Sequence, residues 1–140
     1  MGGFGILEQA DGFRLVALRC NEQRFKKNSQ VEFLPLQGTV NAAFASELYL
    51  KAILKFAKNF SDDQLKKIGH NLLKLFQKIP DEIQNTITPS IDAEKLGIIS
   101  NTFDNWRYLF EDIENKMHNE SVTVYNLMDL LYKSTRSYKK

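Results

Sequence analysis

The chain has 140 residues, of which 43% are hydrophobic and 26% charged, and its formal net charge at pH 7 is +2. This length suits a single domain over residues 1–140, and the apolar fraction is too high for a disordered segment. No stretch reaches the roughly 20 apolar residues of a membrane-spanning helix, and the first residues lack the features of a secretory signal. Since the lone Cys20 cannot form an internal disulfide, we expect a cytoplasmic protein without structural zinc.

The first part of the sequence predicts one helix followed by a loop. Apolar residues at helical spacing predict a helix over residues 6–27, although Asp11 and Gly12 interrupt the pattern. Residues 28–38 are predicted to form a connecting loop. No pair of strands joined by a hairpin turn is expected.

The second predicted helix, over residues 39–59, is the strongest central element. Its charged residues Glu47, Lys51, Lys55 and Lys58 follow steps of 4, 4 and 3 and therefore lie on one narrow stripe. Almost all its other positions are apolar. A helix that is apolar over most of its circumference is usually packed on several sides, so we expect it in the middle of the bundle.

A capping signal marks the start of the third predicted helix. Ser61 and Gln64 have the spacing of a capping box, and apolar residues then repeat at helical spacing until Pro80. A short helix or turn is expected over residues 81–85, and another short helix from Pro89 to about Gly97.

The last part of the sequence predicts two more long helices. Apolar residues in steps of 4, 3, 4, 3 and 4 predict a fourth helix with a packing seam, formed by Ile99, Phe103, Trp106, Phe110, Ile113 and Met117. A fifth helix is expected over residues 122–137. Helices joined by short loops, without a strand signal, indicate an all-α, up-and-down bundle of four to five helices.

The charge is divided unevenly along the chain. Residues 51–80 carry seven lysines against two aspartates, a net +5, whereas residues 81–120 carry nine acidic against three basic residues, a net −6. Neighbouring helices could complement each other across their solvated faces. The alternative is that the basic half attracts a polyanion such as RNA.

Sequence motifs for common chemistries are missing. Neither His70 nor His118 belongs to a metal-binding motif such as HExxH, and neither glycine-rich phosphate-binding loop occurs. We therefore expect no metal and no cofactor.

Three segments together resemble a known family. VNAAFASELYLKAIL begins at Val40, GHNLLKLF begins at Gly69 and FDNWRYLFE begins at Phe103. In this order and spacing, over about residues 39–116, they resemble the HEPN domain, a helical module of prokaryotic defence and toxin–antitoxin systems. The resemblance implies a bundle of four to five helices, frequent homodimers and involvement with RNA or nucleotides. It also implies a stress or phage-defence setting and a possible cognate antitoxin-type protein partner.

The sequence departs from the ribonuclease members of that family. Those members carry an Arg followed four to six residues later by His, whereas Arg107 is followed at these distances by Glu111, Asp112 and Ile113. No arginine precedes His70 or His118 at the required distance either. No catalytic residues are therefore assigned, and the missing pair favours a non-catalytic role.

Polar residues in or beside the segments that resemble the HEPN domain could form a pocket, which is their functional interpretation. It would gather Glu47, Lys51, His70, Arg107 and Tyr108 between the second, third and fourth predicted helices. Lys51 and Arg107 would be the phosphate donors, and Tyr108 or Trp106 would offer a stacking face. The structural alternative is that these residues only form salt bridges within and between helices.

Three hypotheses remain open from the sequence. The first is a non-catalytic HEPN-like module that binds RNA, a nucleotide or a protein partner. The second is a metal-independent ribonuclease that uses a noncanonical pair such as His70 with Arg107. The third is a helical interaction module without a ligand. A homodimer is expected, with aromatic residues of the fourth or fifth predicted helix at its interface.

Overall fold

The computed structural model describes residues 2–22, 24–25, 31–32, 35–104 and 113–139. These residues form seven α-helices, two strands of two residues each and a terminal 3₁₀ helix. The elements are α1 (Gly3–Cys20), β1 (Arg24–Phe25), β2 (Val31–Glu32), α2 (Pro35–Lys58), α3 (Asp62–Ile68), α4 (Leu72–Lys78), α5 (Asp81–Ile87), α6 (Ala93–Asp104), α7 (Ile113–Thr135) and η1 (Arg136–Lys139). The predicted fold class, an all-α bundle, is confirmed.

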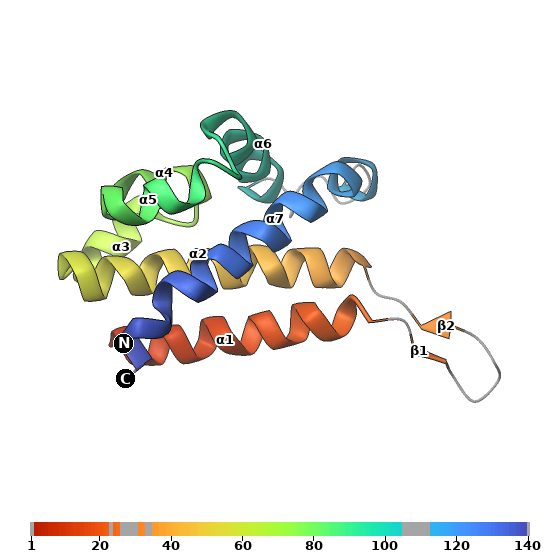
Figure 1. Cartoon of the computed structure of the whole chain (residues 1–140), viewed down its shortest axis with the longest axis horizontal. Helices are drawn as coiled ribbons and strands as arrows, with labels where there is room; N and C mark the ends of the chain where they lie inside the picture. The colour runs from red at the N-terminus through yellow and green to blue at the C-terminus, as the bar shows by residue number, and fades with distance from the viewer. Residues whose placement is uncertain (1, 23, 26–30, 33–34, 105–112, 140) are drawn as a thin grey trace.

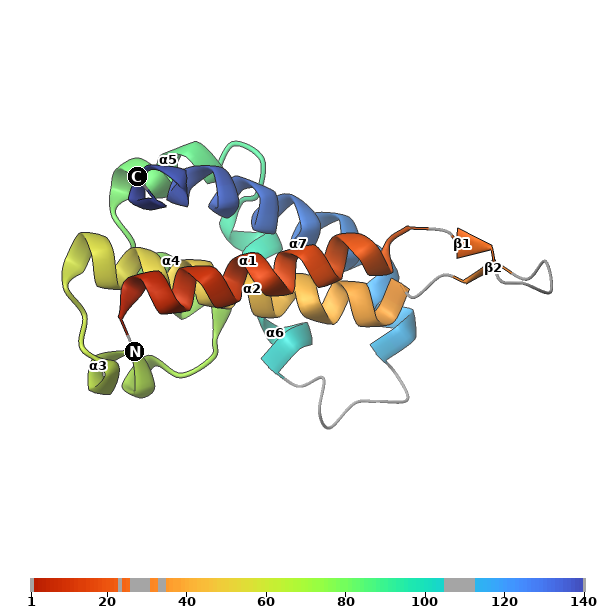
Figure 2. The same ribbon diagram turned by 90° about the horizontal axis from the view of Figure 1, so that it is seen from below.

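Three long helices form the frame of the molecule. α1 and α2 lie side by side and run in opposite directions, and α7 packs across them (Figure 1). The shorter helices α3–α6 cover the other side of this frame, where α4 packs on α2 and α6 packs on both α4 and α7. Seen from below, α1 lies in front of α2 (Figure 2).

The central position predicted for the second helix is confirmed. α2 packs against α1, α4 and α7, and its middle section is fully buried at Tyr49, Leu50, Ile53 and Leu54. Other helices supply the rest of the core, including the fully or almost fully buried Leu7, Leu75, Ile87, Ile99, Leu127 and Leu131. This packing removes a large apolar surface from water, which is the main favourable contribution to folding.

The connection between α1 and α2 differs from the prediction. α1 ends at Cys20 rather than near residue 27, and an antiparallel ladder pairs Arg24 with Glu32 and Phe25 with Val31. Strands of two residues are too short to show the alternation that identifies a strand in a sequence. α2 begins at Pro35, four residues earlier than predicted, because a proline is well suited to the first helical turn.

Two further boundaries differ in the second half of the chain. The seam predicted as one fourth helix is divided, since Ile99 and Phe103 belong to α6 whereas Ile113 and Met117 belong to α7, which packs against α6. Trp106 and Phe110 of that seam lie outside the described residues. Gly97 lies within α6 rather than at the end of a short helix.

One carboxylate on α1 ties three helices together. The Tyr49 hydroxyl donates to Asp11 at 2.5 Å, the Arg136 guanidinium donates to both carboxylate oxygens at 2.7 and 3.2 Å, and the Lys139 ammonium lies 2.7 Å away. Burial raises the pKa of Asp11, but the hydrogen bonds from Arg136, Lys139 and Tyr49 outweigh it and hold this pKa below its ordinary value. Asp11 therefore does not break α1 as its sequence context suggests, because its side chain anchors η1 and α2.

In the described part of the chain, no helix is long and apolar enough to cross a membrane.

Candidate functional site

Three of the five site residues predicted from the sequence lie together. Glu47 Oε2 lies 2.8 Å from His70 Nδ1 and 2.9 Å from Lys51 Nζ. The side chains of Glu47 and Lys51 are only 13% and 14% exposed, whereas His70 is 72% exposed. Arg107 and Tyr108, the other two predicted residues, lie outside the described residues.

A break in the third predicted helix positions His70. Gly69 ends α3 with φ 79° and ψ −139°, a conformation that is essentially restricted to glycine, and its amide donates to the Leu65 carbonyl. Asn71 then caps α4 by accepting from the Lys74 amide at 2.9 Å. The predicted single helix is therefore two helices, and the turn between them presents His70 to α2.

The start of α3 is as predicted. The Gln64 amide donates to the Ser61 hydroxyl at 3.2 Å, and the Ser61 amide donates to the Gln64 side chain at 2.8 Å, which completes the capping box. Lys55 of α2 pairs with Asp62 at 2.5 Å, and this hydrogen bond lowers the pKa of Asp62 to about 2. The capping box and the Lys55–Asp62 pair therefore both fix the first turn of α3, the helix that leads to His70.

The contact with Glu47 determines which nitrogen of the His70 ring carries a proton. A carboxylate only accepts hydrogen bonds, so Nδ1 of His70 carries the proton in this contact and Nε2 remains on the exposed side of the ring. Lys51 donates to the same oxygen of Glu47. Within the part of the chain that the structure describes, the second oxygen, Oε1, makes no hydrogen bond.

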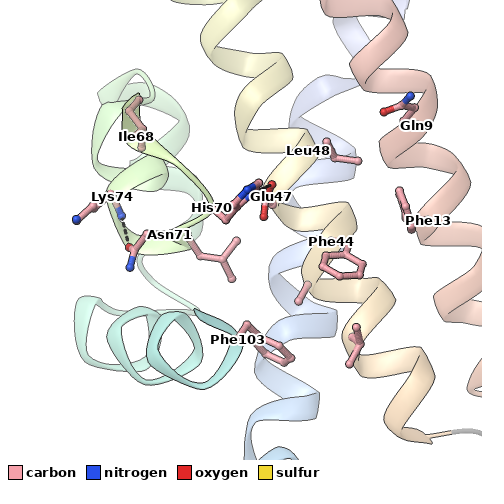
Figure 3. Close-up of a pocket in the computed structure, with 13 residues that line it drawn as sticks. Gln9, Phe13, Phe44, Glu47, Leu48, Ile68, His70, Asn71, Lys74 and Phe103 are labelled. Atoms are coloured by element: carbon pink, nitrogen blue, oxygen red, sulfur yellow. Dashed lines mark hydrogen bonds and ion pairs between the residues drawn. The ribbon is translucent and has the colours of Figure 1, made fainter. Parts of the chain in front are cut away.

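The Glu47–His70 pair lies in the wall of a pocket with a volume of about 540 Å³. Figure 3 shows the pair between the α3–α4 turn and α2, with residues of α1 and α6 completing the surroundings. The lining residues are Gln9, Phe13, Val40, Ala43, Phe44, Glu47, Leu48, Ile68, His70, Asn71, Leu72, Lys74 and Phe103. Eight of these thirteen residues are apolar, three of them phenylalanines, and the other five are polar or charged.

Several pocket residues were not singled out from the sequence as site residues. Phe44 lies one helical turn before Glu47 on α2, and the rings of Phe13 and Phe44 make an edge-to-face contact with their centroids 5.7 Å apart. Phe103 closes the pocket from α6. Such residues have the spacing of core positions, and only the packing of α1 on α2 reveals that they border a cavity.

The two lysines near the pocket differ in whether they already form an ion pair. Lys51, expected from the sequence to donate to phosphate, is largely buried and donates to Glu47 instead. Lys74 lies at the rim, is exposed and forms no ion pair among the described residues, and in Figure 3 its ammonium points away from the Glu47–His70 pair. Lys74 is therefore the cation that remains available to a ligand at this rim.

Comparisons with protein-family models, curated proteins and solved structures find no match to this chain. Among the described residues, no three His, Cys, Asp or Glu side chains lie close enough together to hold a metal ion.

Proposed function

We propose that the chain is a non-catalytic, HEPN-like helical domain of the cytoplasm that binds a nucleotide or an unpaired RNA base. The composition of the pocket wall carries the proposal, because three phenylalanine rings lie there beside the Glu47–His70 pair. Small-molecule sites typically have volumes of about 300–1,000 Å³, mostly apolar walls and a few placed polar groups. The sequence resemblance supports the same ligand class and adds an antitoxin-type partner to the proposal.

The chemistry of a nucleobase suits this wall. Unstacked bases bind to proteins by stacking on aromatic rings and by hydrogen bonds along their edges. Phe13, Phe44 and Phe103 offer the aromatic surface, and the free oxygen of Glu47 can accept a hydrogen bond from a ring or amino N–H group. The exposed ammonium of Lys74 can reach a phosphate by rotation of its side chain.

The proposal predicts weak, salt-sensitive binding that depends on Lys74. We expect Lys74→Ala to weaken the binding of a fluorescently labelled, unpaired oligoribonucleotide by about fivefold to tenfold, since a charge-assisted hydrogen bond to phosphate is lost. Fluorescence polarisation measures this affinity, with mononucleotides as competitors and with increasing salt, which screens the phosphate contact.

Lys58→Ala is the matched control for Lys74→Ala. Lys58 is also exposed, but it ends α2 about 15 Å along the helix axis from the pocket residue Leu48. We expect this variant to bind like the original chain. Equal losses in the two variants would indicate diffuse attraction to the basic segment, and no binding at millimolar nucleotide would contradict the proposal.

One observation favours a ribonuclease as the second candidate function. A carboxylate on Nδ1 orients His70 and leaves Nε2 exposed, which is the arrangement that a histidine uses in general acid–base catalysis. Cleavage of RNA without a metal also requires a cation to stabilise the charge that develops on the phosphate. Lys51 is already paired with Glu47, and the ammonium of Lys74 points away from the His70 ring (Figure 3), so neither lysine is placed beside His70 for that role.

We therefore expect no RNA cleavage above background. The test is incubation of the purified chain with mixed RNA, with and without EDTA, followed by electrophoresis. Robust cleavage that persists in EDTA and disappears in His70→Ala would establish the ribonuclease instead.

A further inference from the structure

The hydrogen-bonding groups that the Glu47–His70 pair leaves for a ligand are acceptors. Lys51 and His70 both donate to Oε2 of Glu47, at 2.9 and 2.8 Å, so one oxygen of the carboxylate is occupied. The other oxygen, Oε1, makes no hydrogen bond within the described residues. Nε2 of His70 is also an acceptor while the ring is neutral, because Nδ1 carries the proton. The pair therefore offers acceptors, and no donor, to a bound molecule.

Phe44 and Glu47 lie on the same side of α2. Phe44 precedes Glu47 by three residues, and side chains at this spacing share one helix face, with their Cβ atoms about 5–6 Å apart. Both residues line the pocket, which Phe103 borders from α6 (Figure 3). A base that packs against these rings therefore has its edge within reach of Oε1 of Glu47.

Among the four bases of RNA, guanine matches a carboxylate at this edge best. Guanine carries two neighbouring donors, N1–H and the N2 amino group, on its Watson–Crick edge. Adenine and cytosine place an acceptor nitrogen beside their amino group, and uracil places its single N–H between two carbonyl oxygens. An acceptor of the base opposite Oε1 would bring two lone pairs together without a proton between them, which costs binding free energy.

We propose that the pocket selects guanine, whose N1–H and N2 amino groups donate to Oε1 of Glu47. Guanine selection rests on the proposed nucleotide binding and adds the identity of the base. The Glu47 side chain is only 13% exposed, so water cannot readily replace a donor that the base lacks. Lys51 and His70 hold the other oxygen, which keeps the carboxylate in place.

The other polar groups of the pocket wall do not reverse this preference. The side-chain oxygen of Asn71 accepts from the Lys74 amide at 2.9 Å, and the Lys74 ammonium points away from the Glu47–His70 pair (Figure 3). Gln9 lies across the pocket on α1, and its amide group both donates and accepts. Gln9 can therefore match any base and does not select among them.

Nucleotides that differ by one donor test guanine selection on the unmodified chain. Titration of the ¹⁵N-labelled chain, followed by the amide shifts of Glu47 and His70, gives a Kd for each nucleotide. IMP lacks the N2 amino group and 1-methyl-GMP lacks the N1 proton, so we expect each to bind about tenfold more weakly than GMP, and AMP at least as weakly. 7-Deaza-GMP keeps both donors and should bind like GMP.

Glu47→Gln tests whether this residue carries the selectivity. Lys51 and His70 are donors, so they retain the oxygen of the new amide and turn its NH₂ group toward the ligand. We expect the preference for GMP over IMP to fall below about twofold, because a donor then faces a donor. Glu82→Gln, the same change on the exposed first turn of α5, should keep the full preference. Circular dichroism checks that both variants fold.

Loss of selectivity and loss of binding are distinguishable outcomes. Equal Kd values for GMP, IMP and AMP, or tighter binding of AMP, would contradict guanine selection while nucleotide binding itself stands. A preference for GMP that persists in Glu47→Gln would contradict the role of Glu47. Absence of shifts with every nucleotide at millimolar concentration would contradict the proposed function and, with it, guanine selection.

Discussion

Asp11→Ala is expected to lower the free energy of unfolding by about 3 kcal/mol, and the unfolding temperature by roughly 10 °C. The substitution removes the acceptor for Tyr49, Arg136 and Lys139 together. Tyr49 is fully buried, so its hydroxyl would be left without a hydrogen-bond partner in the core. Guanidinium-induced unfolding followed by circular dichroism measures the change.

Asp129→Ala is the control for this prediction. Asp129 faces Arg14 at 3.4 Å, its side chain is 46% exposed, and the two facing atoms form no hydrogen bond, so this partly exposed pair should contribute at most about 1 kcal/mol. A loss below 1 kcal/mol in Asp11→Ala, or equal losses in both variants, would contradict the anchoring role of Asp11.

The hydrogen bonds to Asp11 also predict how the free energy of unfolding depends on pH. Because the pKa of Asp11 is lower in the folded chain than in the unfolded chain, its stabilising effect is complete above the unfolded pKa of about 3.9. The effect is lost as the pH falls through the lower, folded pKa. The difference in unfolding free energy between the original chain and Asp11→Asn should therefore be larger at pH 7 than near pH 2.

Gly38→Ala is expected to lower the free energy of unfolding by about 2 kcal/mol, the magnitude of an overpacked core. A Cβ at Gly38 would lie 2.5 Å from the Tyr125 hydroxyl and 3.0 Å from the Cys20 Cβ. The Tyr125 hydroxyl cannot move away freely, because it donates to the Ala17 carbonyl at 2.8 Å. Thermal unfolding monitored by circular dichroism measures the effect.

Gly97→Ala provides a control of opposite sign. Gly97 lies inside α6, and a Cβ there would meet nothing within 4 Å, so alanine should stabilise the helix by up to about 1 kcal/mol. If both substitutions raise or both lower the free energy of unfolding, the close approach of Tyr125 and Cys20 to Gly38 does not explain the effect of Gly38→Ala.

Helical periodicity is why much of the fold could be predicted from the sequence. Because the helix predicted over residues 39–59 is apolar around most of its circumference, we expected it at the centre of the bundle, and α2 is packed on several sides. The capping box at Ser61 is local, since both partners lie within three residues, and it is present. Elements whose signal lies within one helix were therefore predictable.

Breaks and tertiary contacts were harder to predict. Gly69 has an apolar helical pattern on both sides, and that pattern continues across the turn although the helix does not. The ladder of β1 and β2 is too short for any periodicity. Asp11 suggested an interruption of α1 because its partners, Arg136 and Lys139, lie more than 100 residues away in the sequence.

The candidate site was predictable only in part for the same reason. Glu47 and Lys51 are one turn apart on α2, so their contact follows from helix geometry, whereas the sequence predicted only that Glu47 and His70 border the same pocket and not that they contact each other. The apolar wall from α1 and α6 depends on how distant helices pack, which no local pattern specifies.

The location of the bound ligand tests the proposed function most directly. Amide chemical shifts of the ¹⁵N-labelled chain should be recorded while a mononucleotide is added, at a protein concentration low enough to keep the chain monomeric. The account predicts saturable shifts concentrated at the pocket, on Glu47, Leu48, His70, Asn71 and Lys74. Shifts concentrated on α5 or η1, or none at millimolar nucleotide, would contradict it.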